Sequence, residues 1–349
     1  METAMRSLLS DNSRYVESFR LFLKNSTDHQ CMQQFIETRL PGIVSSIGDG
    51  KTNINVLGVG SGSGEIDLKI LSKIQARYPG VSIHTDIVEP SPLQILSYKE
   101  RVAKTPGLEN VHFNWINKTA FEFELQVKEE TSERKYDFIH MIQMLYYVED
   151  VPATLTFFRS LLAPNGKLLI ILVSGKRFKR PFPSNFSFFP SGNSGSSIIW
   201  KKYGPRLPRN NQCLSADDIA DMLRSEGTKY QSYELPSYSN ITECFIDGNR
   251  NGDLMLDFLT ETYDFNKNAS PELREEIIQD LKCPNPIEGI EGRRRTEDGY
   301  TGKASYGGRL HREGVVRRTV TQGRRRTEDG YTGKASYGGR LHRAMDAQT

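Results

Sequence analysis

Four glycines at alternate positions constrain the fold of this chain more than any other feature. The stretch Ile54–Glu65 reads INVLGVGSGSGE: an apolar run ends in Gly58, Gly60, Gly62 and Gly64, and a helical pattern follows. Glycine lets the backbone turn tightly and lets a ligand approach without a Cβ in the way. A strand, a glycine turn and a helix in this order are typical of a nucleotide-binding α/β unit, although an ordinary strand-to-helix loop can look the same.

The spacing of the glycines separates two kinds of cofactor site. The dinucleotide-binding fingerprint needs a further glycine three residues after the second one. That position is Ser63 or Glu65, depending on where the count starts. The pattern GxGxG followed by an acid resembles motif I of class I S-adenosylmethionine-dependent methyltransferases instead. An NAD-dependent dehydrogenase is therefore the weaker interpretation.

A carboxylate stands at the end of the next predicted strand. The run from Ile83 ends in Glu89, twenty-five residues after Gly64, and Pro90 stops the strand. In nucleotide-binding α/β folds an acid at the tip of the second strand accepts hydrogen bonds from the ribose hydroxyls. We therefore predict that Glu89 binds a ribose, with an ordinary surface acid as the alternative.

The alternation of apolar runs and helical patterns predicts an α/β fold. It is Rossmann-like, with a mostly parallel central sheet and helices on both faces. Ligands in such sheets bind beyond the carboxyl ends of the strands, where Gly60, Glu89 and residues 142–147 should meet. We expect strands at 54–59, 82–88, 111–115, 136–142, 167–173 and 229–235, and helices at 11–24, 30–40 (closed by Pro41), 64–77, 91–103, 151–162, 215–226, 253–263 and 271–281.

Two segments lie outside this pattern. Residues 176–197 have neither a helical nor a strand period, so we expect a disordered insertion. Residues 289–349 hold 14 Lys/Arg against 7 Asp/Glu, whereas residues 1–288 hold 32 against 36, and a 21-residue segment at 292–312 recurs unchanged at 323–343. Its Gly- and Arg-rich composition predicts a disordered basic tail. Arg clusters and tyrosines could bind nucleic acid, but we favour a tail with no particular partner.

Cysteine spacing and hydropathy indicate the cellular compartment in which the protein is expected. The four cysteines, Cys31, Cys213, Cys244 and Cys283, have no metal-ligand spacing, which favours reduced thiols and no bound metal. No run of 18 apolar residues occurs, and the N-terminus has no hydrophobic leader. We expect a cytoplasmic monomer that does not enter a membrane.

Longer stretches carry a more specific resemblance. The chain is similar to the vertebrate histamine N-methyltransferase family, a branch of the class I methyltransferases, over roughly residues 5–282 apart from the insertion. The stretches that carry the resemblance are YVESF at 15–19, HQCMQ at 29–33, GEIDL at 64–68, VEP at 88–90, DFIHMIQMLYYV at 137–148, WKKYG at 200–204, CFIDGN at 244–249, GDL at 252–254 and DFLTET at 257–262.

The resemblance implies a cofactor, a substrate and residues for each. S-adenosylmethionine would donate a methyl group to the imidazole nitrogen of histamine that is remote from the ethylamine, which inactivates histamine. The implied cofactor ligands are Gly60, Glu89, Gln94, Ala120 and Ile142, where Ala120 replaces a family serine. Asp28 would bind the substrate ammonium, one methylene shorter than the family's glutamate, and Gln143 would orient the imidazole. Cys213 would lie in the pocket, and the aromatic walls would be Tyr15, Phe19, Tyr146, Tyr147, Trp200 and Phe258.

The resemblance also implies how the chain is divided. A methyltransferase domain would span 1–288, with a small substrate-binding part formed by about 1–45 and 174–245. The insertion replaces a second family tryptophan, near Ser196. The family's apolar final strand, which carries an asparagine for the substrate amine, has no match after Cys283, so we expect that strand to be missing.

The chemistry suits these residue types and leaves alternatives open. A neutral imidazole nitrogen is already a good nucleophile, so no residue is expected to act as a general base and positioning is the main contribution. From the residues alone, Asp28 is better explained as an acid at a helix N-terminus. Three other functions remain: methylation of another small amine or imidazole, a binding protein that holds S-adenosylmethionine or histamine without turnover, and an RNA-binding tail.

Overall fold

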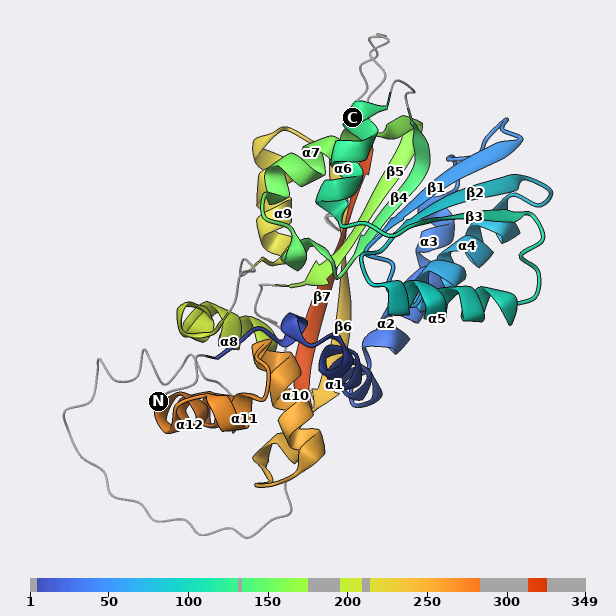
Figure 1. Cartoon of the computed structure of the whole chain (residues 1–349). Coiled ribbons are helices and arrows are strands. Elements are labelled where there is room, and N and C mark those ends of the chain that lie inside the picture. The colour runs from blue at the N-terminus through green and yellow to red at the C-terminus, as the bar shows by residue number, and fades with distance from the viewer. Residues whose placement is uncertain (1–4, 131–133, 175–194, 209–213, 283–312, 325–349) are drawn as a thin grey trace. The chain divides into compact units, whose positions relative to one another are not determined.

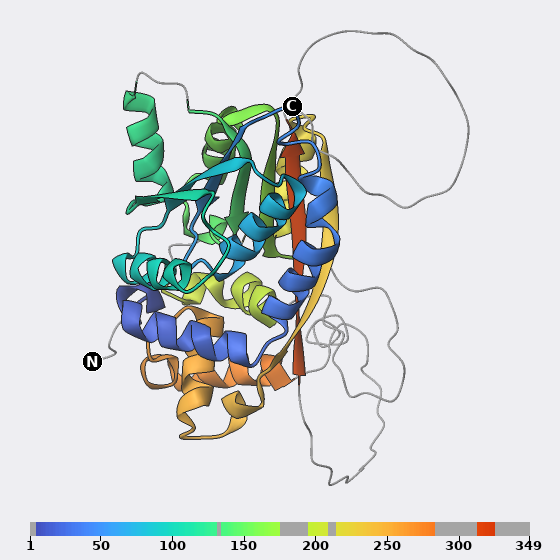
Figure 2. The same ribbon diagram turned by 90° about the vertical axis from the view of Figure 1, so that its right-hand side faces the viewer.

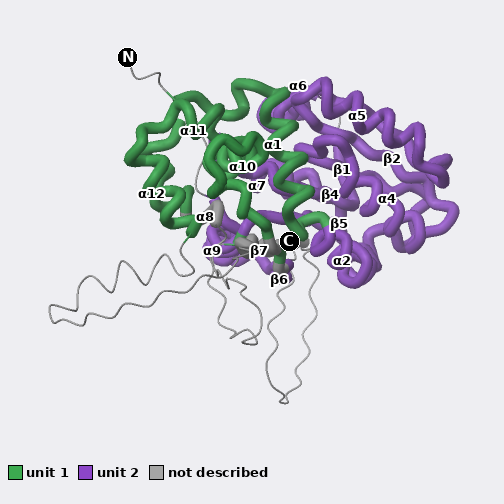
Figure 3. The backbone as a smooth tube through the Cα atoms, turned by 90° about the horizontal axis from the view of Figure 1, so that it is seen from below, with its two compact units in different colours: residues 1–29, 174–213, 236–317 green, residues 30–173, 214–235, 318–349 purple. Residues whose placement is uncertain are grey.

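A computed structural model of the chain describes residues 5–130, 134–174, 195–208, 214–282 and 313–324. The chain divides into two compact units, coloured in Figure 3. Unit 1 comprises residues 1–29, 174–213 and 236–317, and unit 2 comprises residues 30–173, 214–235 and 318–349. The rest of the insertion and of the tail lies outside these ranges, and so does Cys213.

The central sheet confirms the expected α/β fold (Figure 1). Its strand order is β3-β2-β1-β4-β5-β7-β6, and the five strands from β3 to β5 are parallel. These strands are β1 (Asn53–Val59), β2 (Ser82–Val88), β3 (Val111–Ile116), β4 (Tyr136–Ile142) and β5 (Leu162–Val173). The last two strands of the sheet are β7 (Glu313–Arg324) and β6 (Tyr230–Asn240).

Helices cover both faces of the parallel strands in unit 2. Figure 1 shows α3, α4 and α5 on one face and α6, α7 and α9 on the other. The apolar strand residues pack beneath them: Ile54, Val56 and Phe138 are all fully buried, as continuous apolar runs in parallel sheets require. The helices are α2 (Asp28–Thr38), α3 (Leu40–Ile43), α4 (Glu65–Arg77), α5 (Pro92–Ala103), α6 (Ala120–Glu129), α7 (Val151–Ser160) and α9 (Ala216–Ser225), with a 3-10 turn η2 at Leu145–Tyr147.

Unit 1 contains helices from both ends of the described chain. In Figure 3 they form the green part, and α1 and α10 lie side by side in Figure 1 as well. The elements are η1 (Leu8–Ser10), α1 (Asn12–Lys24), α8 (Gly195–Tyr203), η3 (Gly204–Arg206), η4 (Thr242–Phe245), α10 (Arg250–Thr260), α11 (Phe265–Asn268) and α12 (Pro271–Lys282).

The structure differs from the sequence prediction at three helices. Pro41 is the second residue of the short helix α3 instead of only closing the previous helix, because its fixed φ suits a first helical turn. Helix α6 was not predicted, although Thr119 and Glu122 form a capping box at its start. Helix α8 begins at Gly195, inside the segment that was predicted to be disordered.

A strand from the tail corrects the expectation that the final strand is missing. Residues 313–324, which were predicted to be disordered, form β7 and pair antiparallel with β5, from Lys167 opposite Arg324 to Val173 opposite Arg318. Figure 2 shows β7 as the long red strand. Most of it comes from the spacer between the two repeat copies, EGVVRRTVTQ, where three Val and two Thr supply β-branched residues.

Candidate functional site

The glycine turn joins β1 to α4 at the carboxyl end of the sheet. Gly60 and Gly62 adopt φ of +67° and +55°, a region that favours glycine. A Cβ at Gly60 would lie 2.5 Å from the Cβ of Met144, whereas nothing lies within 4 Å of a Cβ at Gly62. The Gly60 amide donates to the Val88 carbonyl at 2.8 Å, which ties the turn to the end of β2.

Glu89 lies against this turn, as the sequence predicted. Its Oε2 accepts from the Gly62 amide at 2.8 Å, and its Oε1 accepts from the Ser91 amide at 2.9 Å. The side chain is buried, and burial raises the pKa of this carboxyl, although the two amide hydrogen bonds oppose that shift. Each carboxylate oxygen has a second lone pair, so Glu89 can hold the turn and still accept hydrogen bonds from a ligand.

Two loops bring the other predicted cofactor residues to the same edge. Ser91 caps α5 by accepting from the Gln94 amide at 3.4 Å, so Gln94 lies in the first turn after Glu89. Asn117 donates from Nδ2 to the Glu89 carbonyl at 3.0 Å and to the Pro90 carbonyl at 2.9 Å. Ala120 begins α6 three residues later. The Glu89 loop and the loop before Ala120 are therefore tied together.

Ile142 ends β4, and Gln143 follows it in a strained conformation. Gln143 has φ of +56°, and its amide donates to the Ile171 carbonyl at 2.9 Å. Its Oε1 accepts from the Tyr146 hydroxyl at 2.9 Å, while its buried Nε2 has no hydrogen-bond partner among the described residues. Strained backbone and buried donors without partners are both expensive, and both are often found at ligand sites.

Tyr146, predicted as an aromatic wall, also makes two hydrogen bonds through its hydroxyl. The side chain is buried, and its hydroxyl accepts from the Val173 amide at 2.7 Å while donating to Gln143. It therefore fixes the orientation of the Gln143 amide. Tyr147, the next residue on η2, is 39% exposed and so remains available as a wall.

This edge of unit 2 suits a ligand with a ribose and a charged, flexible tail. Glycines leave space at the turn, a buried carboxylate faces it, and Nε2 of Gln143, just after β4, has no hydrogen-bond partner among the described residues. These features fit S-adenosylmethionine, whose ribose hydroxyls need a carboxylate acceptor. The described residues hold no group of three or more His, Cys, Asp or Glu that could bind a metal.

Aromatic side chains gather between α1 and α10 in unit 1. Tyr15 and Phe19 stack with their ring centroids 6.1 Å apart, and the Phe19 and Phe258 centroids are 5.6 Å apart. Phe22, which the sequence analysis did not select, lies 4.6 Å from Phe258. Tyr15, Phe19 and Phe258 are only half-buried, so three of the predicted wall residues come together with surface left for contact.

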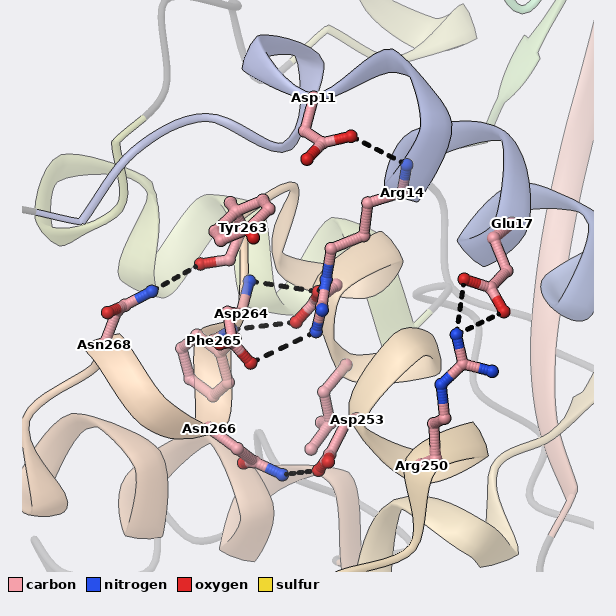
Figure 4. A network of polar contacts seen from close by, with 12 residues as sticks. Asp11, Arg14, Glu17, Arg250, Asp253, Tyr263, Asp264, Phe265, Asn266 and Asn268 are labelled. Carbon is pink, nitrogen blue, oxygen red and sulfur yellow. Dashed lines mark hydrogen bonds and ion pairs between the residues drawn. The ribbon is translucent and has the colours of Figure 1, made fainter.

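A polar network fixes these two helices to each other (Figure 4). Arg14 donates from Nε to Asp257 at 2.5 Å and from a terminal nitrogen to Asp264 at 3.1 Å. Asp257 is fully buried and also accepts from the amides of Asp264 and Phe265, at 3.0 and 2.8 Å. Arg14 precedes Tyr15, and Asp257 precedes Phe258. This pair could not be predicted from sequence patterns, because the two residues are 243 positions apart.

The other predicted substrate residues are Trp200, Asp28 and Cys213. Trp200 is buried, and its indole N–H donates to the Leu259 carbonyl at 2.9 Å. Asp28 is fully buried and is the first residue of α2, which agrees with an acid at a helix N-terminus. Cys213 lies outside the described residues.

Comparison with known proteins identifies relatives along most of the chain. Residues 32–233 match the family model described as "Methyltransferase domain". The histamine N-methyltransferase of Xenopus tropicalis is 62% identical over 286 residues, which are 81% of this chain and 92% of that protein. The Bos taurus enzyme of the same name is 53% identical over the same shares, and the Danio rerio enzyme is 44% identical over 84% of this chain and 95% of its own.

Solved structures that align with most of this chain have much lower sequence identity to it. A putative methyltransferase from Bacillus halodurans is 11% identical, covers 81% of this chain and 96% of its own, and gives a TM-score of 0.46. The fold assignment therefore rests on the sheet itself and on the sequence relatives.

Proposed function

The chain belongs to the histamine N-methyltransferase family, and on that premise we propose how its residues serve the transfer of a methyl group from S-adenosylmethionine to histamine. The observation that carries this function is the 62% identity over 92% of a relative with that name. The glycine turn faced by the buried Glu89 carboxylate is the feature of the fold that supports it.

The cofactor residues act by binding and orientation. When bound, S-adenosylmethionine supplies a methyl group made electrophilic by its sulfonium. We assign the ribose hydroxyls to Glu89, and the neighbouring parts of the cofactor to Gly60, Gln94, Ala120 and Ile142. Ala120 offers no hydroxyl, so that position contributes only apolar contact.

Gln143 sets the tautomer of the substrate ring. Its Oε1 accepts from the Tyr146 hydroxyl and keeps a second lone pair, which can accept the N–H of a neutral imidazole. The other ring nitrogen, remote from the ethylamine, then carries the free lone pair that attacks the methyl carbon. A general base is not needed for this step, and correct alignment alone can lower the barrier by up to about 7–11 kcal/mol.

The family resemblance assigns four further residues to histamine. The half-buried Tyr15, Phe19 and Phe258 offer ring faces that favour cationic groups, each contact worth about 0.5–2 kcal/mol. Asp28 supplies a carboxylate for the ammonium group. Its full burial supports this role, because an ion pair with the ammonium group is stronger away from water.

Two substrates and two variants test the role of Asp28. The parent, Asp28→Asn and Asp28→Glu are compared for kcat/KM with histamine and with 4-methylimidazole, which lacks the ammonium group. An amine ligand predicts that Asp28→Asn loses about tenfold or more with histamine only, and that Asp28→Glu retains activity. If Asp28→Asn matches the parent with both substrates, Asp28 serves only the helix terminus.

We also propose that the protein acts as a monomer in the cytoplasm. Cys244 is a free and buried thiol, which supports a reducing compartment. No described helix has the length and apolar character needed to cross a membrane. Sedimentation of the purified protein and cell fractionation test the two statements.

A further inference from the structure

Four polar side chains meet beneath the glycine turn, and the mechanism above uses none of them. Ser61 comes from the turn, Asp67 from α4, Tyr98 from α5 and His140 from β4. Asp67, Tyr98 and His140 are 3%, 0% and 2% exposed. Such a group inside a parallel α/β core is unusual, because apolar side chains fill such a site at lower cost.

Gly58 marks the point where three of these side chains converge. A Cβ on Gly58 would lie 2.8 Å from Asp67 Oδ2 and 2.8 Å from His140 Cε1, with Ser61 Oγ closer still. His140 Nδ1 lies 3.8 Å from Asp67 Oδ1. The ring of Tyr98 occupies the place of a side chain at Gly64. The cluster therefore supports the turn at both of its ends.

The cluster is costly for stability. Burial raises the pKa of Asp67, while His140 and the hydroxyls of Ser61 and Tyr98 oppose this shift only in part. Ser61 Oγ, Asp67 Oδ2, Tyr98 OH and His140 Nε2 are buried, and none completes a well-formed hydrogen bond with another described residue. A carboxylate in such a place lowers stability, so its presence calls for a reason other than packing.

We propose that Asp67 is a positioning residue for the cofactor, which it serves by holding Ser61 and with it the glycine turn. Ser61 lies between Gly60 and Gly62, and the Gly62 amide donates to Glu89. A shift of Ser61 would therefore displace the amide that orients the ribose-binding carboxylate. His140 on β4 is a second neighbour of this carboxylate, with its Nδ1 3.8 Å from Asp67 Oδ1. This inference rests on the cofactor role of Glu89 proposed above.

Asp67→Asn tests the proposal against a matched control, Asp137→Asn. Asp137 is also a buried carboxylate of unit 2, but it lies at the other end of β4, where it accepts from Lys51 and from the Asn55 amide. Calorimetry would give Kd for S-adenosylmethionine and for S-adenosylhomocysteine, and thermal unfolding would give Tm. We expect Asp67→Asn to raise both Kd values by about tenfold, by similar factors, without lowering Tm. Asp137→Asn should lower Tm and leave both Kd values within twofold.

Three results would overturn the proposal. The first is an unchanged Kd in Asp67→Asn. The second is a loss confined to S-adenosylmethionine, which would indicate attraction of the sulfonium charge instead of positioning. The third is a fall in Tm in both variants together with a rise in Kd in Asp137→Asn as large as that in Asp67→Asn. This result would indicate general destabilisation. Glu89→Gln, measured alongside, distinguishes a failure of this proposal from a failure of the ribose assignment. If only the ribose assignment is wrong, Kd is unchanged in Glu89→Gln but still raised in Asp67→Asn.

Discussion

At the scale of single residues, the Tyr146 hydroxyl sets the orientation of the Gln143 side chain. It accepts from the Val173 amide and donates to Gln143 Oε1, so the Gln143 amide has one preferred orientation. Tyr146→Phe keeps the ring and removes both hydrogen bonds. We expect kcat/KM for histamine to fall about tenfold or more, because each bond within such a buried network is worth about 1 kcal/mol.

The controls for Tyr146→Phe are cofactor affinity and a neighbouring tyrosine. Kd for S-adenosylmethionine should stay within twofold, and Tyr147→Phe, at an exposed position, should match the parent in kcat/KM. If Tyr146→Phe also matches the parent, the orientation of Gln143 does not depend on this hydroxyl.

Asp67 also predicts a dependence of stability on pH. Burial raises its folded-state pKa above the unfolded value of about 3.9. The folded state therefore binds more protons than the unfolded state in the window that begins near pH 4 and ends above the folded-state pKa. The free energy of unfolding contributed by Asp67 falls as pH rises through that window, by about 1.4 kcal/mol for each unit of pKa shift.

Asp67→Asn lacks this titration, so its stability relative to the parent should increase between pH 4 and pH 7. Urea unfolding of both proteins at several pH values measures the difference. A difference that does not change with pH would show that the Asp67 carboxyl has similar pKa values in the folded and unfolded chains.

At the scale of elements, two ion pairs join α1 to α10 and differ in burial (Figure 4). Arg14 pairs with the fully buried Asp257, whereas Arg250 and Glu17 have side chains 75% and 44% exposed. Only the first pair contains a fully buried carboxylate, and an Asn side chain cannot replace its ion pair together with its two amide hydrogen bonds. We expect Asp257→Asn to lower the free energy of unfolding by about 2–4 kcal/mol, and Arg250→Gln by no more than about 1 kcal/mol.

Asp257→Asn should also raise KM for histamine, because Arg14 and Asp257 adjoin the aromatic residues Tyr15 and Phe258. Affinity for S-adenosylmethionine serves as the control, since no cofactor residue proposed here belongs to unit 1. Equal losses of stability in Asp257→Asn and Arg250→Gln would show that burial does not distinguish the two pairs.

Strand β7 forms in the tail, which the sequence predicted to be disordered. It pairs with β5 over seven residue pairs, Lys167–Val173 with Arg318–Arg324, and so covers backbone groups that β5 would otherwise expose. A chain that ends at residue 288 lacks this strand and should unfold several degrees lower in temperature, because unpaired backbone groups beside buried apolar residues are costly. An unchanged Tm would mean that the tail does not pair with β5.

At the scale of the whole molecule, local patterns predicted the parallel part of the fold. Strands β1 to β4 and helices α4 and α5 begin and end within about two residues of their predicted limits. Glycine turns, a proline stop and periodic apolar residues mark their ends, and all of these act between near neighbours. For the same reason the sequence located Gly60 and Glu89, each of which ends a recognisable strand.

Long-range and weakly patterned features were not predictable in this way. The Arg14–Asp257 pair and the Asp67–His140 cluster join residues that are remote in sequence and look like ordinary polar positions. The composition of the tail indicated disorder, yet its β-branched spacer finds a partner in β5. Strand pairing depends on an available edge, which composition does not reveal.

Methyl transfer by the full-length chain is the most direct test of the central claim. The purified protein would be incubated with S-adenosylmethionine labelled in its methyl group and with histamine, and the product identified by mass and by NMR assignment of the methylated nitrogen. We predict methylation at the ring nitrogen remote from the ethylamine, abolished when histamine is omitted. Binding of S-adenosylmethionine without any methylated histamine would contradict the account, and so would a methyl group on the other ring nitrogen.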